Sequence, residues 1–165
     1  MPMSTLKELY IEELEDIYDA EQQITEALPK MMNAASSPAL RSSFEQHLEQ
    51  TRGQIERLDQ ILEKLDADKN GKPCKGMRGI IAEGNEVLKE EAAPEVRDAA
   101  LISAAQRVEH YEMASYGTAV TFARQLGEDQ AAQLLEQTLE EEKQTDLKLT
   151  KLAESRINKK AEQAG

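Results

Sequence analysis

The sequence predicts an all-α protein, a bundle of four long helices with one additional short helix. Of its 165 residues, 39% are hydrophobic and 32% are charged, with no Trp and only two Phe. This mixture, rich in Ala, Glu, Gln, Leu and Lys, is typical of long packed helices rather than of a sheet. The length suits a single domain over residues 1–165, with a flexible polar tail at about 159–165.

Helix caps mark a first hairpin. Ser4 can cap a helix that runs to about Ala35. Ser37 and Pro38 then supply an N-cap and a first helical residue for a second helix, which runs to about Leu65. We expect these two helices to pack against each other as one hairpin.

A long connection follows the first hairpin. The stretch "DADKNGKPCKG", residues 66–76, interrupts helical structure with two Gly and one Pro. A short helix is predicted after it, over about 77–90. A long crossover between two helical hairpins is the ferritin-like arrangement rather than the simple up-and-down bundle.

The second hairpin begins with the longest helix. Pro94 lies near its start, and Gly127 is a natural C-terminal cap after Leu126. The last helix is predicted from Asp129 to about Asn158.

Each long helix carries an inward-facing row of residues spaced alternately by four and three positions. Such spacing predicts a face that packs on neighbouring helices at a shallow angle. In the first helix the row is Tyr10, Leu14, Ile17, Glu21, Ile24, Leu28 and Met31. In the second helix the row is Phe44, Leu48, Thr51, Ile55, Leu58, Leu62 and Leu65.

Glutamates interrupt three of the four rows. Glu21, Glu112 and Glu142 each lie near the middle of a helix, Glu49 lies beside the second row, and Asp146 lies one turn beyond Glu142. A carboxylate inside a bundle is unstable unless a cation, a proton or an arginine compensates it. Carboxylates at one height of four helices are the pattern of a di-iron or di-manganese site, to which two helices normally contribute Glu-x-x-His.

The histidines of that pattern are missing. Neither Glu49 nor Glu142 is followed three residues later by histidine, and Arg52 stands in that position after Glu49. Arg52 could therefore neutralise the pocket with a salt bridge. His47 is interpreted as a solvated or hydrogen-bonded helix residue, and His110 is expected to point away from Glu112.

Two further features bear on this site. Tyr18 and Tyr111, each within a turn of an inward-facing glutamate, are predicted to be core tyrosines that hydrogen-bond those carboxylates. Residues 66–71, "DADKNG", match the opening of an EF-hand loop, but the twelfth position is Met77 instead of glutamate. This segment is therefore interpreted as a linker, with calcium binding as the third and weakest functional reading.

Composition also restricts partners and location. The net charge of −12 argues against nucleic acid, which requires a basic surface. One cysteine, Cys74, excludes an internal disulfide, and no signal pattern or long apolar run is visible, so a cytoplasmic location is expected. Apolar residues outside the inward rows make a homodimer plausible, with no membrane partner.

Three stretches resemble the YciE/YciF family of bacterial ferritin-like proteins, and more closely its YciF members. They are "HLEQTRGQIERLDQIL" at 47–62, "EVRDAALISAAQRVEHYEMASYGT" at 95–118 and "LLEQTLEEEKQTDLKLTKLA" at 134–153. The resemblance implies a ferritin-like bundle with an added short helix, a dimer, a link to bacterial stress responses, and a partial di-iron ligand set. By matching positions, the implied metal ligands are Glu21, Glu49, Glu112 and Glu142, with Glu109 and Asp146 secondary.

Two functional hypotheses follow. In the first, the carboxylate pocket holds a dinuclear Fe or Mn centre that handles oxygen, peroxide or metal during stress. In the second, the protein is a non-catalytic helical stress or structural protein whose site has lost its metal and whose pocket is neutralised by Arg52.

Overall fold

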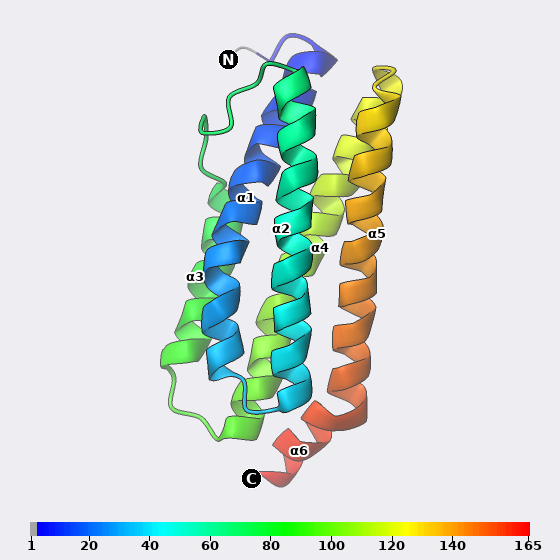
Figure 1. Cartoon of the computed structure of the whole chain (residues 1–165). Helices are drawn as coiled ribbons and strands as arrows, with labels where there is room; N and C mark the ends of the chain where they lie inside the picture. Colours follow the sequence, from blue (N-terminus) through cyan, green and yellow to red (C-terminus); the bar gives the residue numbers. More distant parts are fainter. Residues whose placement is uncertain (1–2) are drawn as a thin grey trace.

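Four long helices form the predicted bundle in the computed structural model, which describes residues 3–165 (Figure 1). The four long helices are α1 (Leu6–Ala34), α2 (Pro38–Lys64), α4 (Pro94–Gln125) and α5 (Asp129–Leu152). The shorter elements are α3 (Lys75–Lys89), the π-helical turn η1 (Ala153–Ile157) and α6 (Asn158–Gln163). The prediction of an all-α bundle is confirmed.

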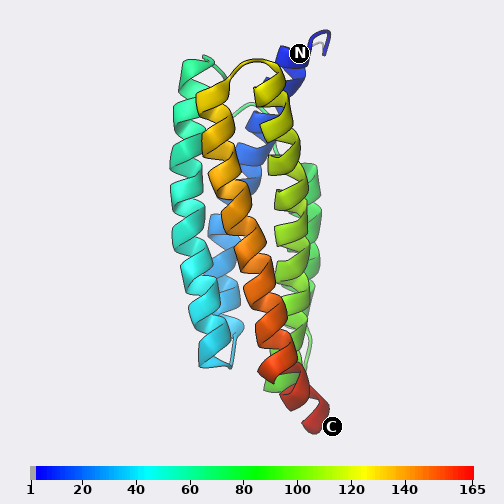
Figure 2. The same cartoon turned by 90° about the vertical axis from the view of Figure 1, so that its right-hand side faces the viewer.

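The two hairpins are joined by a crossover that runs the length of the bundle. α1 packs along α2 and α4, and α5 packs along α4 and α2. The chain leaves α2 at one end and descends through α3, so that α4 starts at the opposite end and runs parallel to α2 (Figures 1 and 2). This is the ferritin-like topology, with α3 lying outside the bundle against α1 and α4.

Local chemistry sets the helix ends. α1 is capped by Thr5 rather than by the predicted Ser4, because Thr5 and Glu8 form a reciprocal capping box. Ser37 caps α2 with Pro38 in its first turn, as predicted. Gly127 takes the left-handed conformation (φ 72°) after α4, which also agrees with the prediction.

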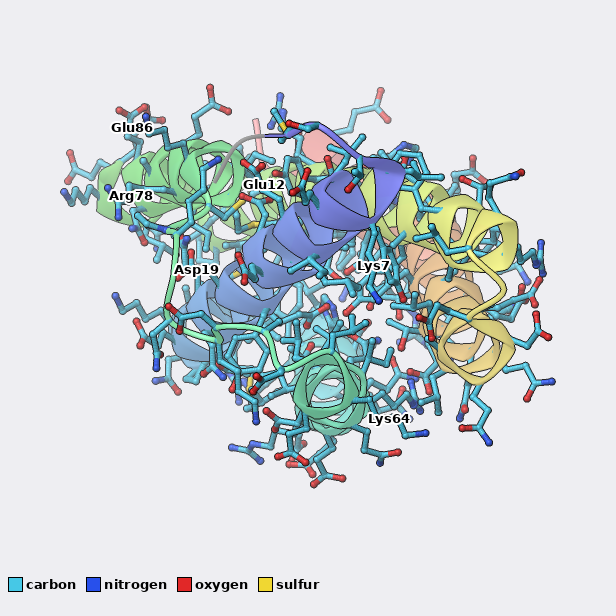
Figure 3. All side chains as sticks on the ribbon, turned by 90° about the horizontal axis from the view of Figure 1, so that it is seen from above. Lys7, Glu12, Asp19, Lys64, Arg78 and Glu86 are labelled. Atoms are coloured by element: carbon cyan, nitrogen blue, oxygen red, sulfur yellow. The ribbon has the colours of Figure 1, made fainter. Side chains whose placement is uncertain are left out.

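The start of α3 is fixed by contacts to α1. Cys74 caps the helix, which begins two residues earlier than predicted, and its backbone N–H donates to Asp19 Oδ2 at 2.6 Å. Figure 3 shows Glu12 and Asp19 on the side of α1 that faces the crossover. Lys72 pairs with Glu12, and Lys69 pairs with Asp59 and Glu63. Residues 66–74 therefore act as a linker that salt bridges hold against α1 and α2.

The core consists of two apolar clusters separated by a polar layer. One cluster, near the α1–α2 turn, includes Leu28, Phe44 and Leu101. The other, toward the opposite end, includes Leu14 and Leu135. The buried charged and amide side chains of the inward-facing rows lie between the two clusters.

The C-terminal end differs from the predicted continuous helix. α5 ends at Leu152, and the wider turn η1 shifts the helical register before α6 begins. That shift places Ile157, which is 2% exposed, against the cluster near the α1–α2 turn. α6 then packs on α4 and extends to Gln163, into the segment expected to be a tail. Across residues 3–165, no helix combines the length and apolarity that spanning a membrane requires.

Candidate metal centre

The polar layer is built from six side chains contributed by all four long helices. Each is at most 3% exposed, so each is held out of bulk water. They are Glu21 on α1, His47 and Gln54 on α2, Glu109 and Glu112 on α4, and Glu142 on α5.

Helical spacing turns these side chains toward one another. Glu109 and Glu112 are three residues apart, which is about one helical turn, so their side chains project from the same face of α4. His47 and Gln54 are seven residues apart, with the buried Thr51 between them, so they share the inward face of α2. α4 thus supplies two carboxylates, as Glu-x-x-Glu, and α2 supplies a histidine that does not belong to a Glu-x-x-His motif.

Two groups of three ligands meet at one carboxylate. His47, Glu109 and Glu142 have ligand atoms within 4.8 Å of one another, and so do Glu21, Glu112 and Glu142. Because Glu142 belongs to both groups, its carboxylate lies between two adjacent sets of donors. A shared carboxylate is the arrangement by which protein sites bridge two metal ions.

Several contacts orient the donors. His47 Nε2 lies 3.0 Å from Glu109 Oε1 and 3.8 Å from Glu142 Oε2. Gln54 Nε2 donates to Glu142 Oε1 at 2.6 Å. The Tyr116 hydroxyl donates to Glu21 Oε1 at 2.8 Å. The group with His47 therefore has one carboxylate held by a neighbouring hydrogen bond, Glu142, and the group with Glu112 has two, Glu21 and Glu142.

The pocket has far more acceptors than donors. Within the described chain, eight buried atoms of these residues have no hydrogen-bond partner. They are Glu21 Oε2, His47 Nε2, Gln54 Oε1, both carboxylate oxygens of Glu109 and of Glu112, and Glu142 Oε2. His47 Nε2 and Glu109 Oε1 are 3.0 Å apart but do not meet in hydrogen-bond geometry. A buried polar atom without a partner costs about 1–3 kcal/mol, so this set of atoms is strained unless cations or protons satisfy it.

Burial controls the protonation of the protein without metal. It raises the pKa of Glu21 to about 8, and it raises the pKa values of Glu109 and Glu112 well above the usual range. The neighbouring Glu142 adds to the effect on Glu109, and Glu21 adds to the effect on Glu112. Burial lowers the pKa of His47, so its imidazole is neutral and can offer a nitrogen lone pair.

A salt bridge between α2 and α5 supports the pocket from outside. Both terminal nitrogens of Arg57 donate to the Glu141 carboxylate, at 2.7 and 2.9 Å. Arg57 also donates to Thr138 Oγ1 at 2.9 Å. Gln54 Nε2 lies 3.3 Å from Glu141 Oε1, so this ion pair also fixes the amide that orients Glu142.

Glu21, Glu112, Glu142 and the secondary candidate Glu109 all lie in the pocket, whereas Glu49 lies outside it. Glu49 is 68% exposed and pairs on the outer surface with Arg52, which is 58% exposed. The expectation that Arg52 neutralises the pocket is therefore wrong.

His47, and not the predicted Glu49, is the residue of α2 that belongs to a candidate ligand group. The sequence prediction did not identify it. The predicted row includes Leu48 and Ile55 because they are apolar, and it therefore places the neighbouring polar residues on the solvent side. The row Phe44, His47, Thr51, Gln54 and Leu58 has the same alternating spacing, and all five residues are buried. That second row was the available signal for both His47 and Gln54.

Asp146 is also outside the pocket, which corrects its assignment as a secondary ligand. It is 21% exposed, and its Oδ1 lies 3.0 Å from His110 Nε2. His110 is 66% exposed and faces away from Glu112, as predicted. The two residues form a surface pair between α4 and α5.

The tyrosine that contacts a pocket carboxylate is Tyr116. Tyr111 instead donates to Asp16 Oδ2 at 3.2 Å and lies 3.1 Å from Cys74 Sγ, so its predicted role is wrong. Tyr18 is half-buried at the edge of the apolar cluster that contains Leu14. Tyr116 is one of the largest fully buried side chains and reaches Glu21 on the neighbouring helix α1.

Comparison with known proteins identifies relatives over nearly the whole chain. Protein YciF of Escherichia coli is 53% identical over 163 residues, which are 98% of each chain. The crystal structure of that E. coli stress protein matches with a TM-score of 0.91 and 52% identity, covering 95% of this chain and 99% of its own. YcfI of Rhodopseudomonas palustris matches with a TM-score of 0.86 and 44% identity, covering 90% and 94%. These relatives confirm the resemblance seen in the sequence. Residues 5–162 match a family described as a domain of unknown function, DUF892, and the chain belongs to that family.

Proposed function

We propose that the pocket holds a dinuclear Fe or Mn centre and serves oxygen, peroxide or metal handling in a bacterial stress response. The observation that carries this proposal is the pair of three-ligand groups that share Glu142. The eight unpartnered atoms around it support the same conclusion, because they are the atoms that cations would satisfy. The description of the E. coli relative as a stress protein supports the physiological context.

Charge balance favours two divalent ions. The pocket contains four buried carboxyl groups, from Glu21, Glu109, Glu112 and Glu142. When all four are ionised their charge equals that of two divalent cations in magnitude, and a neutral His47 leaves this balance unchanged. No single divalent ion would compensate the same set.

The donor types favour Fe or Mn over calcium and structural zinc. Carboxylate oxygens with one imidazole nitrogen suit Fe and Mn, whereas calcium sites use oxygen alone and structural zinc sites use four Cys or His ligands. Such a centre, when bound, would supply redox chemistry toward oxygen or peroxide. The chain itself would orient the ligands through Tyr116 and Gln54, and the two apolar clusters would exclude water.

The alternative is a non-catalytic helical protein whose pocket is kept neutral by protons. The raised pKa values of Glu109 and Glu112 favour it, since protonated carboxyls need no cation. Arg52 takes no part in this alternative, because it lies on the surface. Metal binding at neutral pH separates the two proposals, since metal must displace those protons.

Anaerobic loading with Fe(II) or Mn(II), followed by elemental analysis, tests the proposal. We expect about two ions per chain in the wild-type protein, as in other dinuclear carboxylate bundles. Glu142→Gln should abolish most binding because Glu142 serves both groups. Glu49→Gln is the matched control, since it changes an exposed glutamate and should retain wild-type metal content. Wild-type protein without metal above background would favour the alternative.

A further inference from the structure

A narrow apolar crevice lies between α1, α3 and α4. It is lined mainly by aliphatic side chains, and its cavity volume is about 30 Å³. The aliphatic lining includes Ile24 and Leu28 from α1, Ile80, Ile81 and Leu88 from α3, and Val108 from α4. Figures 1 and 2 show α3 alongside α1 and α4. The residues of α3 that line the crevice form its outer side.

The crevice runs from the outside of the bundle to His47, one residue of the candidate metal centre. Ile80, Ile81 and Gly84 on α3 are half-buried, so they form its outer rim. His47, which is 3% exposed, belongs to the crevice lining and also to the ligand group with Glu109 and Glu142. One buried lining residue of the crevice is therefore a candidate metal ligand.

Size and polarity limit what can pass. A volume of about 30 Å³ admits a water-sized or diatomic molecule, and an apolar cavity of this kind disfavours water. A hydrated metal cation would lose its water shell against aliphatic walls, at a large cost in free energy. The polar lining residues are Asn85 at the rim and His47 at the inner end.

We propose that this crevice is the route by which dioxygen, a small apolar oxidant, reaches the His47 side of the centre. This inference rests on the proposed function, because it names the oxidant and the side from which it approaches. The α3 helix buries only Met77 completely, so its half-buried cover can open locally to pass a diatomic molecule.

Gly84 offers a way to close the crevice without touching the ligands. A Cβ added at Gly84 would lie 3.8 Å from Ala104 Cβ, an ordinary contact, so a leucine fits at its base and extends into the crevice. Gly79 lies on the same helix with nothing within 4 Å of an added Cβ and does not line the crevice. Gly84→Leu and Gly79→Leu both replace glycine by a better helix former, so they are matched variants.

Xenon binding tests the crevice in the metal-free protein. Xenon is an apolar probe for cavities that dioxygen can enter. Crystals of the wild-type protein and of Gly79→Leu under xenon pressure should show xenon between α1, α3 and α4, and Gly84→Leu should not. Absence of xenon from the wild-type crevice would overturn the proposal whatever the metal content.

Oxidation kinetics test the route itself. After anaerobic Fe(II) loading, Gly84→Leu should bind wild-type amounts of iron but react with dioxygen about tenfold more slowly, equivalent to roughly 1.4 kcal/mol. Gly79→Leu should react at the wild-type rate. A wild-type rate in Gly84→Leu would refute the route while leaving the metal centre intact. A wild-type protein that binds no iron would remove the proposed function, and the route with it.

Discussion

The metal-free protein should lose stability as the pH rises above neutral. The pKa of Glu21 is raised to about 8 in the folded protein, whereas an unfolded glutamate titrates at roughly 4.3. Between these values the folded state binds more protons than the unfolded state, so the free energy of unfolding falls with increasing pH. Glu109 and Glu112 act in the same direction, because burial raises their pKa values too.

His47 sets the lower limit of the useful pH range. Burial lowers its pKa, so below roughly pH 6.5 this imidazole is less protonated in the folded than in the unfolded state, and its own contribution to stability falls as the pH decreases. There it opposes the contribution of the buried carboxyl groups, which runs the other way. Above that pH only the carboxyl groups contribute to the slope. From about pH 6.5 to about 8, one carboxyl that titrates near 8 lowers the free energy of unfolding by about 1.6 kcal/mol, because the slope of 1.36 kcal/mol per pH unit halves as the group becomes half ionised.

Urea unfolding in the presence of a chelator measures this slope. Glu21→Gln should flatten it, because the variant lacks a carboxyl whose pKa is raised by burial. Glu49→Gln should leave it unchanged, because Glu49 is exposed. A free energy of unfolding that stays constant or rises over this range in the wild-type protein would refute the account of a protonated, cation-deficient pocket.

Two further predictions separate the surface arginine from the supporting one. Arg52→Met should change the free energy of unfolding by less than about 0.5 kcal/mol, because both partners of its ion pair are exposed. Chemical denaturation measures this change, and a larger loss would contradict the surface position of the ion pair. Arg57→Met should cost about 1–2 kcal/mol, more than an exposed pair, because Arg57 and Glu141 are 17% and 24% exposed. It should also weaken metal binding by about tenfold, through Gln54, and titration with Mn(II) will show whether it does.

Much of the fold could be predicted because local signals determine it. The cap at Ser37, the proline that follows it and the left-handed Gly127 each mark a helix boundary through backbone chemistry. In α1 the predicted inward row agrees with burial from Tyr10 to Leu28, because a single apolar row with one glutamate has only one consistent register. Thr5 is the first cap in place of Ser4 because its Oγ1 accepts from the backbone N–H of Glu8, three residues on, while the Glu8 carboxylate accepts from the Thr5 backbone N–H.

The site was harder to predict because polar and apolar rows lie side by side on one helix. On α2 the row with Leu48 and Ile55 and the row with His47 and Gln54 share the same spacing. Hydrophobicity favours the first row, but a pocket of carboxylates on the neighbouring helices stabilises the second. The same holds on α4, where the buried Glu109 lies next to the apolar Val108, so hydrophobicity alone favours Val108 for the inward position. Such choices depend on what the facing helices contribute, which a single helix cannot reveal.

Anomalous diffraction from crystals loaded anaerobically with Fe(II) tests the metal centre most directly. Data collected on both sides of the iron absorption edge locate iron without reference to its ligands. We expect two peaks in the polar layer, one among His47, Glu109 and Glu142 and the other among Glu21, Glu112 and Glu142. Iron confined to surface carboxylates such as Glu49, or an iron-free layer in fully loaded crystals, would contradict it.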